Sequence, residues 1–358
     1  MPTFRTGTVV DVTSTSRSGV QELRVDVEGA VRKAVLFPRW AAPAKSGDRV
    51  LLNTTAVELD LGTGGVDFVV WNHEVDAYES ASGGHIMKLR YTPAQCDVLA
   101  VESPESPHHL AMAQARTLGS APVVATSLHS QLVPVLCGLR RIAPQARVAY
   151  VMTDGAALEA GFSHTLRALR EQEWLCGVVT SGHAVGGDLE SVTLHSGLLA
   201  ATHVLHADIV IAGIGPGVVG TATPYGTTAL DLGTIALTSQ ALGGRTVVSV
   251  RLSEADPRPR HRGVSHHMAA ALGWVAAAVD PSTSCVVAPP GWSDAIADAI
   301  RPWPVREGEP GDVLTELAEA ASVGIGVSHM GRSPQEDPLF FQAAAAAGSY
   351  AAGLLSAV

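Results

Sequence analysis

Apolar and polar positions follow two different patterns along this chain of 358 residues. Up to about residue 75 the apolar residues form short, partly alternating, β-branched runs, separated by Gly, Ser, Asp and Pro; examples are TGTVVDVT, QELRVDVEG and DRVLLNTTAV. Alternation with a period of two turns one face of a strand inward, and frequent turn residues favour antiparallel neighbours. We therefore predict a small antiparallel β-barrel-like domain over residues 1–75 and a linker over residues 76–94.

From residue 95 the apolar runs become uninterrupted and longer polar-apolar segments separate them. The runs are DVLAVE, APVVATS, RVAYVMTD, CGVVTSG, ADIVIAG, TVVSVRLSE and SCVVAPP. Within residues 156–173, Leu158, Phe162, Leu166 and Leu169 recur on one helical face. Strands that are buried on both faces and alternate with helices build a parallel sheet. The predicted fold class is α/β, and residues 95–358 are expected to form a mostly parallel sheet flanked by helices.

Composition limits the classes of partner. Hydrophobic residues make up 46% of the chain and charged residues 16%, so a large core is expected. The formal net charge of -10 disfavours nucleic acid, which needs a basic face. The sequence offers no uninterrupted apolar run of about 18 residues for a membrane. Its four cysteines form no C-x-x-C pair and its start does not resemble a signal peptide, which favours a cytoplasmic protein.

Polar residues follow several of the expected strands. Ligands of open parallel sheets bind beyond the carboxyl ends of the strands. We therefore expect one crevice to be lined by the following residues: His129, Asp154, His183, Asp188, Gly217 and His266.

The stretch GIGPGVVGTATPYG follows the run ADIVIAG and is rich in glycine. Gly215, Gly217 and Gly220 match G-x-G-x-x-G formally, but no acid lies about 20 residues further on, as a dinucleotide site would need. The backbone N–H groups of this loop, together with the hydroxyls of Thr221 and Thr223, suit a phosphate or carboxylate. Close packing between strand and helix is the alternative reason for the glycines.

The stretch RHRGVSHHM holds a second set of candidates. Ser265 is a candidate helix cap, which would place His266 and His267 in the first turn as acid/base or anion-binding groups. A divalent metal is the alternative, with His261 as a third ligand, although the spacing matches no standard zinc pattern. Plain capping and packing is a third explanation. The densest basic patch of the chain overlaps this stretch and comprises Arg258, Arg260, His261 and Arg262.

Two acids in GGDLESV add a further alternative. Asp188 and Glu190 could hold a metal or, with His183, orient a base; they could equally stabilise the start of a helix. Asp154 has the same ambiguity between ligand and helix cap. The cofactor is therefore open, with a divalent metal as one candidate.

Several strings together resemble an uncharacterised bacterial family, domain of unknown function 3866. They are DRVLLNTTAVELDLGTGG, GHIMKLRYTP, SLHSQL, GGDLESV, GIGPGVVGTATPYG, GVSHHM and MGRSPQEDPLFF. The resemblance covers nearly the whole chain and implies that five residues are a family signature: Gly215, Gly217, Gly220, His266 and His267. It implies no activity, because the family has none established. His329 is not part of the resemblance.

The leading functional hypothesis is an enzyme, a hydrolase or transferase, that acts on a small anionic metabolite, phosphorylated ones included. A non-catalytic ligand sensor is one alternative. The other is an assembly protein whose alanine-rich tail packs against a second copy, which keeps a homodimer open.

Overall fold

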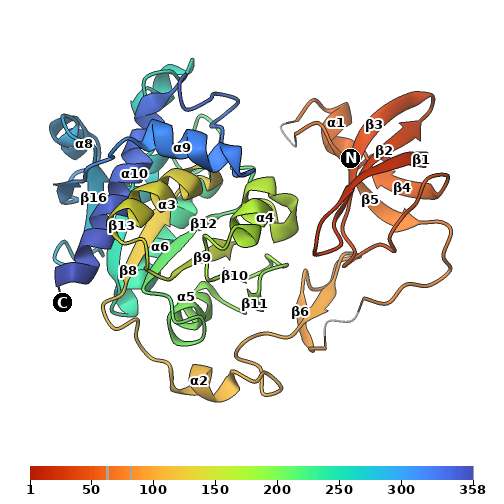
Figure 1. The fold of residues 1–358 in the computed structure, drawn as a ribbon, viewed down its shortest axis with the longest axis horizontal. Coiled ribbons are helices and arrows are strands. Elements are labelled where there is room, and N and C mark those ends of the chain that lie inside the picture. Colours follow the sequence, from red (N-terminus) through yellow and green to blue (C-terminus); the bar gives the residue numbers. More distant parts are fainter. Residues whose placement is uncertain (62–63, 81–82, 358) are drawn as a thin grey trace. The chain divides into compact units, whose positions relative to one another are not determined.

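The computed structural model describes residues 1–61, 64–80 and 83–357. They divide into two compact units, Met1–Leu99 and Ala100–Val358, each of which is considered by itself (Figure 1). No described helix combines the length and the apolarity that crossing a bilayer would need.

The first unit contains a closed barrel of five strands in the order β1-β2-β3-β5-β4. Alternate residues of the strands point inward, and Leu23, Val25 and Leu52 belong to the barrel's own core. This confirms the barrel that the alternating pattern predicts. One pair departs from the antiparallel expectation, because β3 and β5 run parallel. All other neighbours in the barrel are antiparallel, so β3 and β5 both have the direction of β1 and close the barrel as a parallel pair. The elements are β1 (Phe4–Thr15), β2 (Gln21–Val27), β3 (Ala30–Leu36), β4 (Arg49–Asn53), α1 (Thr55–Glu58) and β5 (Asp67–Asn72).

A short hairpin of β6 (Ile86–Lys88) and β7 (Cys96–Val98) completes this unit. The run DVLAVE, expected as a strand of the parallel sheet, instead supplies the end of β7. Beyond it Ala100 makes a single parallel bridge to Glu190. An apolar run of this length can pair with β6 or with the parallel sheet, so the apolar pattern alone does not predict which pairing forms.

The second unit is built on an eight-stranded sheet in the order β11-β10-β9-β12-β8-β13-β16-β17. Every neighbouring pair in it is parallel, which confirms the predicted fold class. All residues of β8, β9 and β12 are buried, which explains why their sequences are uninterrupted apolar runs. The strands are β8 (Pro122–Thr126), β9 (Val148–Thr153), β10 (Gly177–Thr180), β11 (Leu189–Glu190), β12 (Ile209–Ile214), β13 (Arg245–Ser249), β16 (Ser284–Ala288) and β17 (Val305–Glu307).

Helices cover both faces of this sheet (Figure 1). One hydrophobic core takes side chains from α3 (Leu132–Ile142), α4 (His164–Glu171), α9 (Val313–Ser322) and α10 (Pro338–Gly353). The other takes side chains from α2 (His109–Gln114), α5 (Leu194–His203), α6 (Asp231–Ala241), α7 (His266–Gly273) and α8 (Ser293–Ala299).

The alanine-rich tail forms α10 and packs against α3 within the chain itself. A Cβ at Gly138 would overlap the Ala345 carbonyl, and one at Gly348 would overlap the Val135 carbonyl. The two backbones therefore approach as closely as small residues allow. Nearly all of Leu339–Ala352 is buried in this way, so the tail face invoked for a second copy is covered by the protein's own core.

The helix expected over residues 156–173 begins later. A short 3-10 turn, Ala160–Phe162, precedes α4, and the Ser163 hydroxyl caps α4 by accepting the Leu166 N–H at 3.0 Å. Leu166 and Leu169 are buried, as their spacing indicates. The serine cap satisfies a backbone donor that a longer helix would have bonded internally, so it sets the start.

Candidate functional site

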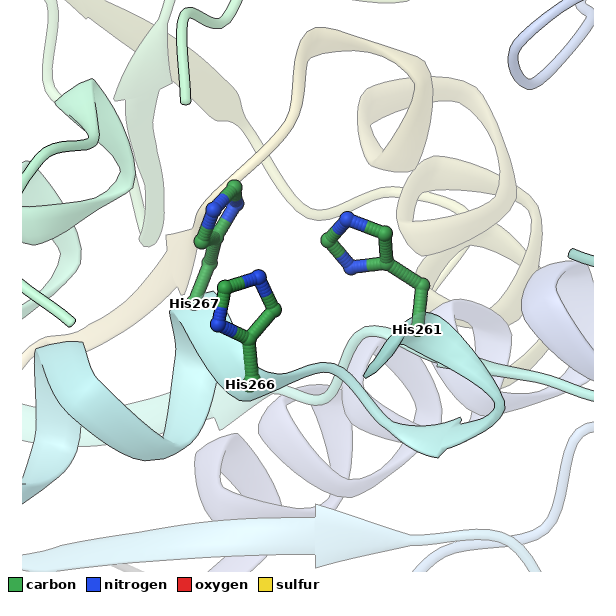
Figure 2. A group of neighbouring side chains, drawn as sticks. All are labelled: His261, His266 and His267. Atoms are coloured by element: carbon green, nitrogen blue, oxygen red, sulfur yellow. The ribbon is translucent and has the colours of Figure 1, made fainter. Parts of the chain in front are cut away.

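A compact excursion follows β13 and returns into α7. It contains the strands β14 (Leu252–Ser253) and β15 (Gly263–Val264), paired antiparallel, and the turn Pro259–His261 between them. This hairpin brings His261 beside the two histidines that open α7. Its ring centroid lies 5.0 Å from that of His266 and 5.0 Å from that of His267, and the latter two are 4.1 Å apart. Figure 2 shows the three rings around a common space.

Hydrogen bonds orient two of the rings. His261 Nδ1 lies 2.8 Å from the Ser265 hydroxyl, and His267 Nε2 lies 3.2 Å from the Thr221 carbonyl oxygen. A carbonyl can only accept, so His267 carries its proton on Nε2 and presents a lone pair at Nδ1. Ser265 precedes α7 as expected, but its hydroxyl contacts His261 and caps no helix N–H.

The three rings also bring nitrogen atoms close together. One ring nitrogen from each of His261, His266 and His267 lies within 4.8 Å of the others. His266 Nε2 and His267 Nδ1 are buried without a hydrogen-bond partner. Buried polar atoms are normally satisfied, so two unpartnered nitrogens within a cluster of three histidines make this cluster a candidate ligand site.

The electrostatic environment keeps these rings neutral. Burial lowers the pKa of His261 to about 3, and the nearby cations of Arg251 and Arg258 add to the effect. Burial also lowers the pKa of His266 and of His267. Neutral imidazole is the form that coordinates metal ions.

The glycine-rich loop after β12 lies directly against this cluster. A Cβ at Gly220 would overlap the His267 ring, so glycine is required there for close approach. The N–H groups of Val219, Thr221 and Thr223 are bonded within the loop, to the Thr228 hydroxyl, the Gly226 carbonyl and the Thr221 hydroxyl. The residue that follows Gly220 supplies the carbonyl that orients His267, so the loop helps to build the histidine cluster.

Two other glycines of the signature differ. A Cβ at Gly215 would meet the Ala157 carbonyl at 2.7 Å, which is a packing constraint. Gly217 has a φ of +100° and faces open space. An anion held by the backbone at Gly217 stays a prediction.

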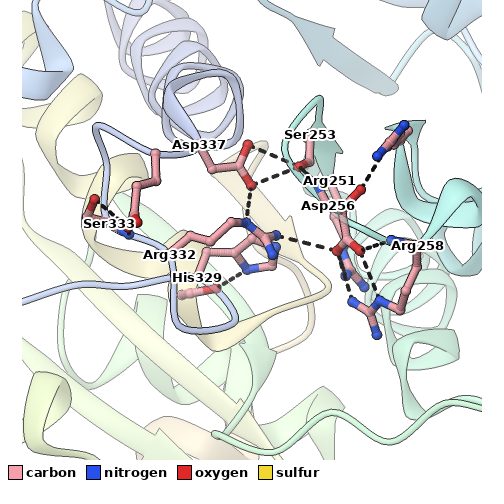
Figure 3. Close-up of polar contacts among 11 residues, drawn as sticks. Arg251, Ser253, Asp256, Arg258, His329, Arg332, Ser333 and Asp337 are labelled. Atoms are coloured by element: carbon pink, nitrogen blue, oxygen red, sulfur yellow. Dashed lines mark hydrogen bonds and ion pairs between the residues drawn. The ribbon is translucent and has the colours of Figure 1, made fainter.

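Figure 3 shows a network of arginines and aspartates. Two of its arginines, Arg251 and Arg258, are near enough to the three histidines to lower their pKa values. The fully buried Asp256 accepts two hydrogen bonds from the Arg258 guanidinium group, both at 2.9 Å, one from the Arg258 backbone N–H at 3.0 Å and one from Arg332 at 3.4 Å. Asp337 accepts from Arg332 Nε at 3.0 Å and from the Ser253 hydroxyl. The Arg258 hydrogen bonds hold the pKa of Asp256 well below its usual range. This network ties the segment after β13 to the turn before α10.

The other candidates from the sequence have partners of their own. Asp154 accepts the His183 N–H at 2.9 Å. Asp188 pairs with Arg170 and accepts the Val178 N–H, and Glu190 accepts from the Thr180 hydroxyl and the Gly186 N–H. These contacts join the loops around β9, β10 and β11. The single crevice that would join them to His266 stays a prediction.

His129 is also tied to neighbouring structure. Its Nε2 lies 2.7 Å from the Ser163 hydroxyl and its Nδ1 lies 3.4 Å from the Tyr150 hydroxyl. Burial lowers the pKa of His129 to about 4. The ring therefore supports the cap of α4.

Sequence reasoning missed most of the arginine-aspartate network. Its members come from positions as far apart as Arg251 and Asp337, and no local spacing connects them. The available signal is the string MGRSPQEDPLFF, which contains Arg332 and Asp337 and belongs to the family resemblance. His329, which is not part of the resemblance, also lies at this network (Figure 3).

Comparison with curated proteins gives no match. A family model described as "Protein of unknown function (DUF3866)" matches residues 33–348, which is most of the chain. The match includes the glycine-rich loop, the three histidines and the arginine-aspartate network. The chain therefore belongs to the DUF3866 family of proteins of unknown function.

Proposed function

We propose that this protein is an enzyme that holds a divalent metal ion of the zinc type with His261, His266 and His267 and acts on a small anionic metabolite. The observation that carries the proposal is the clustering of one ring nitrogen from each of three histidines, two of which hold a buried ring nitrogen without a hydrogen-bond partner.

The donor set fits such an ion. Catalytic zinc sites use three protein ligands and leave a position open, with Zn–N distances of about 2.0–2.1 Å. Tetrahedral bonds of that length place ligand nitrogens about 3.4 Å apart. The nitrogens here lie within 4.8 Å of one another, so small rotations of the rings would complete the coordination.

The surroundings also match those of metal ligands. Ligating histidines normally bond their second nitrogen to a nearby acceptor, which fixes the ring. The Ser265 hydroxyl and the Thr221 carbonyl occupy these positions for His261 and His267. A ring that ligates a metal cannot also transfer protons, so this proposal replaces acid/base catalysis by His266 or His267.

A metal ion held there would supply Lewis-acid polarisation of a bound oxygen and activation of water, which are the needs of a hydrolase or transferase. The chain's own residues would hold the ion and orient its ligands. The neighbouring arginines would give the site a preference for anions.

Metal content tests the proposal directly. Full-length protein would be stripped with chelator, reloaded with zinc, desalted and measured by plasma mass spectrometry. We expect about one ion per chain in the wild type, lost in His266→Gln because a ligand is removed. His195→Gln, at an exposed position on α5, is the matched control and should keep the ion. Equal zinc in all three proteins would contradict the site.

Catalysis needs a separate measurement. Hydrolysis of a panel of small phosphate and carboxylate esters should require the ion, stop with chelator and resume on reloading. The protein could also retain the ion and hydrolyse none of these esters, with or without added metal. That result would favour a non-catalytic ligand sensor over an enzyme.

A further inference from the structure

We propose that Arg251, together with His329, forms a binding site for an oxyanion, a phosphate or carboxylate group, next to the three histidines. That this anion belongs to the substrate rests on the proposed function; that the anion binds does not.

The first reason is an unsatisfied guanidinium group. Arg251 is 3% exposed, and its Nε and Nη2 atoms are buried without a hydrogen-bond partner. Nη2 lies 3.7 Å from Asp256 Oδ2, which is within ion-pair range but too long for a hydrogen bond. Burying a cation with unsatisfied donors is costly. An oxyanion would bond these donors and offset the charge.

The second reason is the local balance of charge. Three arginines, Arg251, Arg258 and Arg332, surround two buried carboxylates, Asp256 and Asp337. The network therefore has one more positive than negative charge. Burial and the neighbouring arginines lower the pKa of Arg251 to about 10, so the group stays cationic at neutral pH. Arginine is well suited to oxyanions because its planar fork matches two oxygen atoms.

The third reason is His329. Its ring stacks on Phe340 with centroids 3.7 Å apart, and its Nδ1 lies 3.3 Å from the Ser130 hydroxyl. Its Nε2 is buried without a hydrogen-bond partner. Burial, with Arg251 and Arg332 nearby, lowers the pKa of His329 to about 3, so the ring is neutral. If the Ser130 hydroxyl donates to Nδ1, Nε2 carries the proton and is a second free donor.

The position of this site suits a substrate anchor. The Arg251 carbonyl accepts the N–H of Ser265, the residue directly before His266. On the solvent side the Arg258 and Arg332 side chains are 39% and 16% exposed. An incoming anion would meet these two guanidinium groups first. Because the Arg251 donors are closed to solvent here, the proposal includes a side-chain rearrangement on entry.

Inorganic phosphate is the probe, and isothermal titration calorimetry on metal-free, full-length protein is the measurement. We expect wild type to bind phosphate and Arg251→Met to bind it at least about tenfold more weakly, the loss typical of a charged hydrogen bond. Arg260→Met removes an exposed arginine nearby and should change the affinity by less than about twofold.

A second variant guards against misfolding. His329→Phe keeps an aromatic ring on Phe340 but removes the free nitrogen, and it should also weaken phosphate binding. Circular dichroism checks that each variant is folded. Should Arg251→Met not fold, His329→Phe decides: phosphate affinity equal to that of wild type would overturn the inference.

Crossing these variants with the metal experiment separates the two proposals. His266→Gln should lose zinc binding and keep phosphate binding. Arg251→Met should keep zinc binding and lose phosphate binding. Zinc binding in a wild type that takes up no phosphate, metal-loaded or metal-free, would overturn the anion site alone. Phosphate that depends on Arg251 in a protein without zinc affinity would overturn the metal site alone. Loss of phosphate in His266→Gln with no loss in Arg251→Met would place the anion on the histidines and refute the inference.

Discussion

At the residue scale, single atoms decide which nitrogen of His267 is left as a lone pair and whether its ring fits. His267 can present Nδ1 as a lone pair only because its Nε2–H donates to the Thr221 carbonyl oxygen. The ring fits there only because residue 220 has no side chain. The adjacent histidines in the sequence reveal neither this hydrogen bond nor the lack of space at residue 220. One methyl group at residue 220 is thus a sharper probe of the site than removal of a ligand.

We expect Gly220→Ala to displace the His267 ring and reduce zinc affinity at least about tenfold, through loss of one well-placed ligand. Gly273→Ala is the control. Gly273 ends α7, the helix that contains His267, and a Cβ there meets nothing within 4 Å. Zinc titration against a competing chelator measures both. Unchanged affinity in Gly220→Ala would mean that the His267 position is not needed for the ion.

Acid should destabilise the protein through His129. Burial lowers its folded pKa to about 4, whereas the unfolded value is about 6.5. Below pH 6.5 the unfolded chain takes up a proton that the folded protein takes up only near pH 4, so stability falls over that interval. The loss from pH 7 to pH 5 is about 2 kcal/mol for this residue.

His129→Gln removes the titrating ring, so its free energy of unfolding should fall by about 2 kcal/mol less between pH 7 and pH 5 than that of wild type. Urea unfolding at the two pH values measures the difference. Exposed His195→Gln should follow wild type. Parallel pH dependence in all three proteins would show that His129 is not buried as a neutral ring.

Close packing of α3 and α10 is the main feature at the element scale. The two helices meet through glycine and alanine, and Arg141 Nη2 donates to the Ser349 hydroxyl at 2.8 Å across the contact. Helices that touch through backbone atoms leave no space for an added carbon.

Gly348→Ala should therefore destabilise the protein by about 1–3 kcal/mol, because the new methyl group overlaps the Val135 carbonyl. Gly353→Ala in the same helix meets nothing within 4 Å and should be neutral or slightly stabilising. Guanidinium unfolding compares the two. Equal stability of both variants would contradict the close helix contact.

At the scale of the whole molecule, each unit has a hydrophobic core of its own. The three histidines, the loop that contacts them and the arginine-aspartate network all belong to Ala100–Val358. We expect residues 100–358, expressed alone, to fold and to bind zinc and phosphate with affinities within about threefold of the full chain. Calorimetry on the fragment measures this. A folded fragment that binds neither would mean that the barrel unit takes part in the site.

Local patterns along the chain were enough for the fold class and for part of the site. Uninterrupted apolar runs such as ADIVIAG correspond to buried parallel strands, and alternating runs to the barrel, because burial on two faces or on one leaves different periods in the sequence. His266 and His267 could be singled out because they are adjacent and follow an expected strand. Gly220 could be singled out as part of a glycine-rich loop. The sequence could not show why glycine is needed there, namely the close contact with the His267 ring.

Tertiary structure alone decided which residues meet. The β14–β15 hairpin brings His261 to the two histidines of α7, and the turn before α10 brings His329 and Arg332 to Arg251 across some 80 positions. Hydrophobic periodicity records which face of an element is buried and not which other element covers it. Contacts among polar groups leave no period at all, since each depends on the path of two distant segments. For this reason the sequence determined the layers of the protein, and only the folded chain determined which residues form its candidate site.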